Sequence, residues 1–205
     1  YNETDGESIL PTPTVGMVGL LEDASRAVPH AFAAEHDVVA LLGETRDELG
    51  QSEYLATVLG REEGPCPQLD LLTVRSMVDL LVELSGDGLL SSAHDVSEGG
   101  LATALAEAAI PSGLGAELNV ETALLPTVYL FSQSAPRAVV SFPPGNERAV
   151  LEAARRHGVP TAFLGRVTKG PLRVRVSGNV VLDVPVAELR EASEGAFPKL
   201  MEVPE

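Results

Sequence analysis

The amino-acid sequence predicts an α/β fold of the α+β type, a mixed β-sheet covered by helices. Short apolar runs alternate with stretches whose apolar residues recur at helical spacing. The run at residues 37–43 is almost wholly apolar, as expected for a strand covered on both faces. Residues 172–176 instead alternate apolar and basic residues before Ser177-Gly178-Asn179, which predicts an antiparallel hairpin, 172–184, with one solvated face.

In the first half of the chain the pattern predicts two strands, two helices and a further strand. We expect residues 1–14 to be an extended loop broken by Pro11 and Pro13, and residues 15–21 to form a strand whose glycines permit close packing. After the strand at 37–43 we expect a short helix at 52–59. A longer helix at 69–84 ends at Gly86, and its apolar stripe is expected to face the core: Leu69, Leu72, Met77, Leu80, Leu81 and Leu84. Residues 88–93 read as a short strand.

In the second half, strands and helices continue to alternate. A helix is expected at residues 101–110, stopped by Pro111, followed by strands at 115–120 and 137–142. Residues 143–146 turn the chain into a helix at 147–157, Gly158 ends it, and a strand returns at 159–167. After the hairpin, Pro185 is expected to open a terminal helix at 186–192, with another turn or two near Leu200.

Composition narrows the class of protein. The chain has 205 residues and a net charge of −16, with 4 Lys and Arg against 19 Asp and Glu in residues 1–100. Nucleic-acid binding would need a basic stripe, so this balance argues against it. No run approaches the ~20 apolar residues of a membrane helix and no leader pattern is seen, so we expect a cytoplasmic protein. The single cysteine, Cys66, is expected to be an inert thiol.

The most informative segment is the predicted strand-to-helix turn at residues 93–102. Helix N-terminal N–H groups lack backbone partners and favour an anion, and Ser97 is placed to donate to a phosphate oxygen. Asp95 is itself acidic, and a magnesium ion bridging its carboxylate to a phosphate would explain its presence there. The alternative is a capping box in which Ser97 or Asp95 caps the helix. Gly99 and Gly100 disfavour a helix, which suits close approach by another backbone or by a ligand.

The motifs of the chain resemble one enzyme family. The string His94-Asp95-Val96-Ser97-Glu98-Gly99-Gly100-Leu101, with residues 104–107 after it, resembles the signature of the phosphoribosylformylglycinamidine synthases, the synthetase subunits of purine biosynthesis. Flanking matches occur in the same order, at residues 1–4, 11–19, 50–55, 67–70, 130–131 and at Arg137. The resemblance covers nearly the whole chain. It implies the C-terminal domain of the aminoimidazole ribonucleotide synthetase superfamily at residues 31–205, preceded at 1–30 by the tail of an N-terminal-type domain and a linker.

The resemblance also implies a function for the parent enzyme. Members are ATP-dependent ligases that convert formylglycinamide ribonucleotide, ATP and glutamine-derived ammonia to formylglycinamidine ribonucleotide, ADP and phosphate. Partners are the remaining synthetase domains, a glutaminase subunit and a small accessory subunit. Because the chain starts at Tyr1 and lacks the family's catalytic histidines, we expect a non-catalytic fragment, and its tail favours a short-type parent working with separate subunits.

Site residues follow from the resemblance position by position. Asp95 matches the magnesium ligand of an auxiliary ATP or ADP site, and Ser97, with Gly99 and Gly100, the part that contacts the nucleotide. For His94 we expect a hydrogen-bonded or structural histidine rather than a metal ligand. Gln133 stands where the resemblance implies glutamate, so we expect residues 130–134 to serve structure rather than bind substrate.

Three hypotheses therefore remain open. The chain is the non-catalytic part of this ligase, a stand-alone magnesium–nucleotide-binding module of a related synthetase, or a pure interaction domain.

Overall fold

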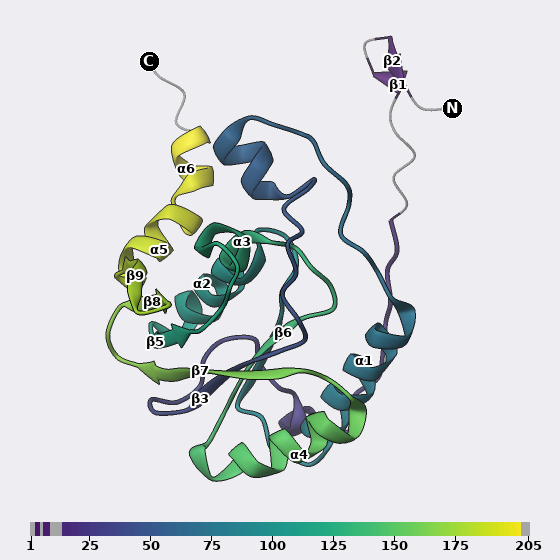
Figure 1. Cartoon of the computed structure of the whole chain (residues 1–205), viewed down its shortest axis with the longest axis vertical. Helices are drawn as coiled ribbons and strands as arrows, with labels where there is room; N and C mark the ends of the chain where they lie inside the picture. The colour runs from purple at the N-terminus through teal and green to yellow at the C-terminus, as the bar shows by residue number, and fades with distance from the viewer. Residues whose placement is uncertain (1–2, 5, 9–13, 202–205) are drawn as a thin grey trace.

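The computed structural model describes residues 3–4, 6–8 and 14–201. Its main element is a seven-stranded mixed sheet in the order β4-β6-β3-β7-β5-β8-β9 (Figure 1). Only β5 and β8 pair in parallel, and the other neighbours are antiparallel. The strands are β3 (Val38–Leu42), β4 (Ser92–Asp95), β5 (Gly115–Val120), β6 (Ala138–Phe142), β7 (Thr161–Thr168), β8 (Leu172–Val176) and β9 (Asn179–Val184). The predicted fold class is confirmed.

Helices cover both faces of this sheet. They are α1 (Leu71–Gly86), α2 (Gly100–Ser112), α3 (Pro126–Phe131), α4 (Glu147–His157), α5 (Val186–Glu194) and α6 (Ala196–Met201), with short turns η1 (Ala24–Arg26), η2 (Tyr54–Val58, a π-helix) and η3 (Pro144–Asn146). In Figure 1, α1 and α4 lie together on one side, and α2 lies with α3 and α5 on the other. The strand β3 is buried along its whole length, as its apolar sequence predicts.

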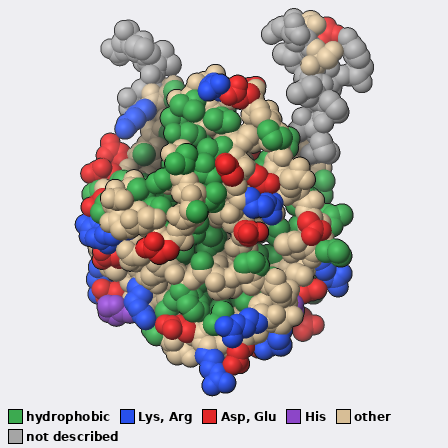
Figure 2. Space-filling model, in the orientation of Figure 1, with side chains coloured by type: hydrophobic (Ala, Val, Ile, Leu, Met, Phe, Trp, Pro, Cys, Tyr) green, Lys and Arg blue, Asp and Glu red, His purple; other side chains and the backbone are tan. Residues whose placement is uncertain are grey.

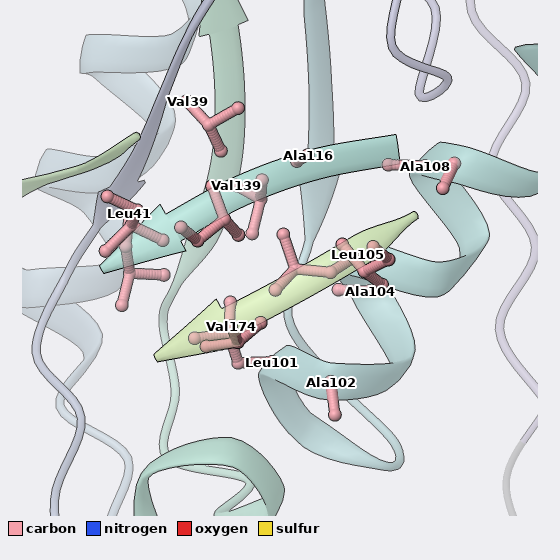
Figure 3. Close-up of a cluster of buried hydrophobic side chains, with 14 of the residues drawn as sticks. Val39, Leu41, Leu101, Ala102, Ala104, Leu105, Ala108, Ala116, Val139 and Val174 are labelled. Atoms are coloured by element: carbon pink, nitrogen blue, oxygen red, sulfur yellow. The ribbon is translucent and has the colours of Figure 1, made fainter. Parts of the chain in front are cut away.

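The two faces of β3 belong to two separate cores. Val38, Ala40 and Leu42 pack with the buried residues of α1 and α4. Val39 and Leu41 pack on the opposite side, in the core that α2 fills. Figure 3 shows Leu101, Leu105 and Ala108 of α2 in this second cluster, together with Val139 and Val174 of the sheet. The sheet therefore anchors α2, and through it the turn that precedes α2.

Two predictions about the N-terminal region are wrong. Residues 15–21 form no strand, and their apolar side chains are exposed, with Val18 at 103% and Met17 at 94%. Of the predicted loop at 1–14, residues 1–2, 5 and 9–13 lie outside the described part, including Pro11 and Pro13. The described residues there form two short antiparallel strands, β1 (Glu3–Thr4) and β2 (Glu7–Ser8).

Three helices differ from their predictions in detail. In α1, Met77, Leu80 and Leu84 are buried as expected, but Leu69 and Leu72 are exposed because they lie at or before the first turn, beyond the edge of the core. Pro111 does not stop α2, which continues through it to Ser112 and ends at Gly113 with a left-handed φ of +72°. The helix α3 was not predicted, although Pro126 stands at its start, where proline is favoured.

The chain carries mixed charges on its surface. On the face in Figure 2, acidic and basic side chains are interspersed among apolar ones. Within the described ranges, none of the helices is both long enough and apolar enough to cross a membrane.

Candidate functional site

The strand-to-helix turn lies within the predicted segment 93–102, between the last residue of β4, Asp95, and the first residue of α2, Gly100. The strand before it begins at Ser92, four residues later than the predicted start at residue 88. Val96 is buried, and its N–H donates to the carbonyl oxygen of Arg137 at 3.0 Å, which extends the β4–β6 pairing by one residue. Asp95, Ser97 and Glu98 are exposed. One apolar residue thus pins the turn to the sheet, and the polar side chains around it are open to solvent.

Gly99 and Gly100 are glycines for different structural reasons. Gly99 is the residue that caps α2, with φ +73° and no side-chain hydrogen bond, so the expectation of a capping box at Ser97 or Asp95 is wrong. A Cβ at Gly100, which has φ +69°, would lie 2.7 Å from the carbonyl oxygens of Leu130 and Ser132. The structure therefore shows that it is another backbone segment that approaches Gly100 closely.

Gln133 connects the turn to a distant part of the chain. Its Oε1 accepts from the backbone N–H of Glu53 at 2.7 Å and more weakly from that of Gly99 at 3.4 Å. Next to it, the rings of Tyr54 and Phe131 stack with centroids 4.8 Å apart. The π-helical segment η2, the end of α3 and the turn before α2 therefore meet at one side chain. This agrees with a structural role for residues 130–134.

A buried arginine supports the loop that follows Gln133. Arg137 is 3% exposed, and its guanidinium donates to the carbonyl oxygen of Ser134 at 2.7 Å, to that of Ser132, and to the Thr45 hydroxyl at 3.0 Å. Burial lowers the pKa of Arg137 to about 10, so the group remains charged at neutral pH. The sequence predicted Arg137 as the first residue of a strand and as a family match, whereas β6 begins one residue later, at Ala138. Through its guanidinium contacts Arg137 ties the 132–137 loop to Thr45.

His94 is hydrogen-bonded, as expected. Its Nδ1 lies 2.7 Å from the Asp95 carbonyl oxygen and 3.3 Å from Asp95 Oδ1, and its Nε2 lies 3.4 Å from Oε2 of Glu107 on α2. The His30 ring packs edge-on against it, with centroids 5.5 Å apart. The imidazole thus joins the end of β4 to the side of α2.

Asp95 borders two hollows. The first, of about 350 Å³, is also lined by Ser97, Met77, Leu81 and Arg137. The second, of about 520 Å³, is lined by His30, His94, Glu107 and Glu194 among others and is therefore acidic. A phosphate group would be repelled by these carboxylates, so the hollow with Ser97 suits an anion better.

The arrangement can hold a metal ion only with help from a ligand. The described residues contain no group of three or more His, Cys, Asp or Glu that could hold one. Magnesium, however, is commonly bound through one or two carboxylates with waters and substrate phosphates completing its octahedron. The exposed carboxylate of Asp95 beside the Ser97 hydroxyl fits that mode of binding and does not fit an all-protein metal cage. Elsewhere, Cys66 is exposed and forms no disulfide.

Comparison with known proteins identifies the class. The chain belongs to the family described as AIR synthase related protein, C-terminal domain, which matches residues 34–177. Strands β3 to β8, helices α1 to α4 and the Asp95 turn lie within that range, and β9, α5 and α6 follow it.

Two curated relatives are PurL subunits. "Phosphoribosylformylglycinamidine synthase subunit PurL" of Alkaliphilus metalliredigens is 43% identical over 203 residues, which cover 98% of this chain and 27% of the relative. The PurL subunit of Caldanaerobacter subterraneus is 40% identical over 202 residues, covering 98% of this chain and 28% of that protein. The chain thus spans about a quarter of the length of these relatives.

Solved structures show the same fold. "T. maritima PurL complexed with FGAR" superposes with a TM-score of 0.73 at 23% identity, covering 82% of this chain and 30% of that one. "T. maritima PurL complexed with ATP" gives a TM-score of 0.66 at 22% identity, with 82% and 28% covered.

Proposed function

We propose that this chain is the C-terminal part of a phosphoribosylformylglycinamidine synthase. The whole enzyme would convert formylglycinamide ribonucleotide, ATP and glutamine-derived ammonia to formylglycinamidine ribonucleotide, ADP and phosphate, phosphorylating the substrate amide oxygen and displacing phosphate with ammonia. The observation that carries the proposal is the 43% identity to a PurL subunit over nearly the entire chain. The turn at Asp95, with Ser97 exposed beside it, supports a contribution to nucleotide binding.

Within that enzyme the chain would act as a scaffold and not as the catalytic part. Asp95 would ligate magnesium at an auxiliary ATP or ADP, and Ser97 would contact the nucleotide from the turn that Gly99 and Gly100 shape. Magnesium would neutralise phosphate charge that Asp95 alone would repel. Gly100 is buried under residues 130–132, so we assign Ser97 the direct contact and the glycines the shape of the turn.

Residues 1–30 would be the tail of the preceding N-terminal-type domain and a linker. The family match begins at residue 34, and the apolar side chains of residues 15–20 are exposed in this chain. Burying them against the remaining synthetase domains would be favourable by the hydrophobic effect. A glutaminase subunit and a small accessory subunit complete the proposed assembly, which would work in the cytoplasm.

A chimera tests the enzymatic assignment. This chain would replace the matching stretch of the Alkaliphilus metalliredigens PurL subunit, and the product would be assayed for ATP hydrolysis that depends on ammonia and formylglycinamide ribonucleotide. We expect activity from the chimera and none from the isolated chain. A folded, soluble chimera without activity contradicts the assignment, and turnover by the chain alone contradicts the scaffold role.

The site is tested by calorimetric titration of the chain with ADP, with and without magnesium. We expect magnesium to strengthen ADP binding, and Asp95→Asn to abolish that gain because the amide carries no charge. Glu98→Gln is the matched control, since Glu98 is an exposed carboxylate in the same turn. Equal heats for the unchanged chain and Asp95→Asn would show that Asp95 does not hold the metal.

A further inference from the structure

The imidazole of His94 is held between two carboxylates that come from different elements. Nδ1 approaches both the main chain and the side chain of Asp95, at 2.7 and 3.3 Å, and Nε2 approaches Glu107 at 3.4 Å. The side chain of His94 is 15% exposed, whereas that of Asp95 is 74% exposed. A ring contacted on three sides, counting the edge contact of His30, therefore stands beside a carboxylate for which the described residues provide no other partner.

The contacts also define which nitrogen carries hydrogen. A carbonyl oxygen can only accept, so the 2.7 Å contact requires a hydrogen on Nδ1. The same N–H lies close to Asp95 Oδ1 and favours side-chain rotamers that keep this oxygen beside the ring. Among the described residues, the contact of the Asp95 side chain with the ring is made by Oδ1, and the carboxylate is largely exposed.

We propose that His94 is a positioning residue that orients the Asp95 carboxylate toward the magnesium ion of a bound nucleotide. This role rests on the nucleotide site proposed above. Groups that hydrogen-bond to a metal ligand orient it, and their loss typically weakens metal affinity by about 10- to 100-fold. His94 would act in this way without touching the metal.

Two substitutions separate the two sides of the ring. In His94→Asn the side-chain amide N–H stands near the place of Nδ1, so the contact with Asp95 is kept and that with Glu107 is lost. In His94→Gln the amide reaches toward the place of Nε2, so the contact with Glu107 is kept and that with Asp95 is lost. ADP is titrated at a series of magnesium concentrations at constant neutral pH. We expect His94→Asn to keep the magnesium dependence of the unchanged chain and His94→Gln to need about 10-fold more magnesium.

ADP affinity without magnesium should be the same in all of these variants, because the proposed role acts only through the metal. The matched control is His157→Gln. His157 is also a partly buried histidine, 24% exposed, with Nε2 2.7 Å from Oε2 of Glu83, but it lies on α4, across the sheet from α2. We expect this control to lower stability without changing the magnesium dependence. Equal magnesium requirements in His94→Asn and His94→Gln, or a shift in the His157 control as large as that in His94→Gln, would overturn the positioning role.

A nucleotide-free measurement distinguishes failure of this role from failure of the site. Two-dimensional proton–nitrogen NMR of the imidazoles should show His94 with its hydrogen on Nδ1 before any ADP is added. The Nε2–H tautomer, found together with normal magnesium-dependent ADP binding, would refute the role of His94 and leave the nucleotide site intact. Absence of magnesium-dependent ADP binding in the unchanged chain would refute the site, and the role of His94 with it.

Discussion

Replacing the glycine at each end of α2 by alanine tests why the turn contains glycine. Gly100 begins this helix with φ +69° and Gly113 follows its last residue with φ +72°, so the backbone strain of the two substitutions is nearly the same. Left-handed geometry costs a non-glycine residue about 1–2 kcal/mol. The loss of glycine's freedom in the unfolded chain offsets about 0.4–1 kcal/mol of this. Gly113→Ala should therefore lower the free energy of unfolding by about 1 kcal/mol.

Gly100→Ala has an additional cost because its methyl group meets backbone. The added Cβ would lie 2.7 Å from two carbonyl oxygens, whereas a Cβ at Gly113 meets nothing within 4 Å. Overpacking a tight site costs typically about 1–3 kcal/mol, so the total should be about 2–4 kcal/mol.

Urea unfolding followed by circular dichroism, without nucleotide, measures both values at comparable slopes. If Gly100→Ala is no more destabilising than Gly113→Ala, close packing of residues 130–132 against the turn is not the reason for the glycine.

Two further predictions concern the packing of α2 and the ion pairs of Glu83 on α1. Leu105→Ala removes a fully buried side chain of α2 and should lower the free energy of unfolding by about 2–5 kcal/mol. Leu71→Ala, at a residue that is 73% exposed, should change it by less than about 0.5 kcal/mol. Both are measured in the same urea assay. On the other side of the sheet, hydrogen bonds from His157 and Arg156 hold the pKa of Glu83 below its ordinary value of 4.5. A carboxyl with a lowered folded-state pKa stabilises the fold above the unfolded-state pKa and loses this contribution as the pH falls through the folded-state value. Glu83→Gln should therefore be less stable than the unchanged chain at neutral pH and equal to it in acid, and a pH-independent difference would contradict this pairing.

The strands of the sheet were predictable because their signal is local. An unbroken apolar run, as in β3, or strict alternation, as in β8, reports burial on two faces or one without reference to any other segment. The same local pattern at residues 15–21 led to a wrong prediction. A strand also needs a partner to accept and donate its backbone hydrogen bonds, and the described part of this chain supplies none to these residues. Sequence pattern shows that a segment suits a strand, and it does not show which domain pairs with it.

The position of the turn was predictable from the sequence, but the contacts that shape it were not. The glycines, the hydroxyl and the carboxylate located the turn correctly between β4 and α2. The contacts that shape it come from Gln133 and from the backbone of residues 130–132, 30 or more positions away. A glutamine that accepts two backbone N–H groups has no local pattern, since its role depends on where α3 ends in space. A nearby signal did exist in Pro126, which marks the start of α3.

These contacts explain the glycine at position 100 without any ligand. Gly100 is required by the carbonyl groups of α3 and its following loop, so any chain with this packing needs glycine there, whether or not it binds a nucleotide. The glycine pair of the turn is therefore evidence for the fold, in agreement with the family match, and adds little to the case for a ligand. That case depends on the side chains the packing leaves free, the exposed carboxylate of Asp95 and the exposed hydroxyl of Ser97. No capping or core contact in the described structure accounts for these two groups, and for this reason the nucleotide experiments are directed at Asp95 and its neighbour His94 rather than at the glycines.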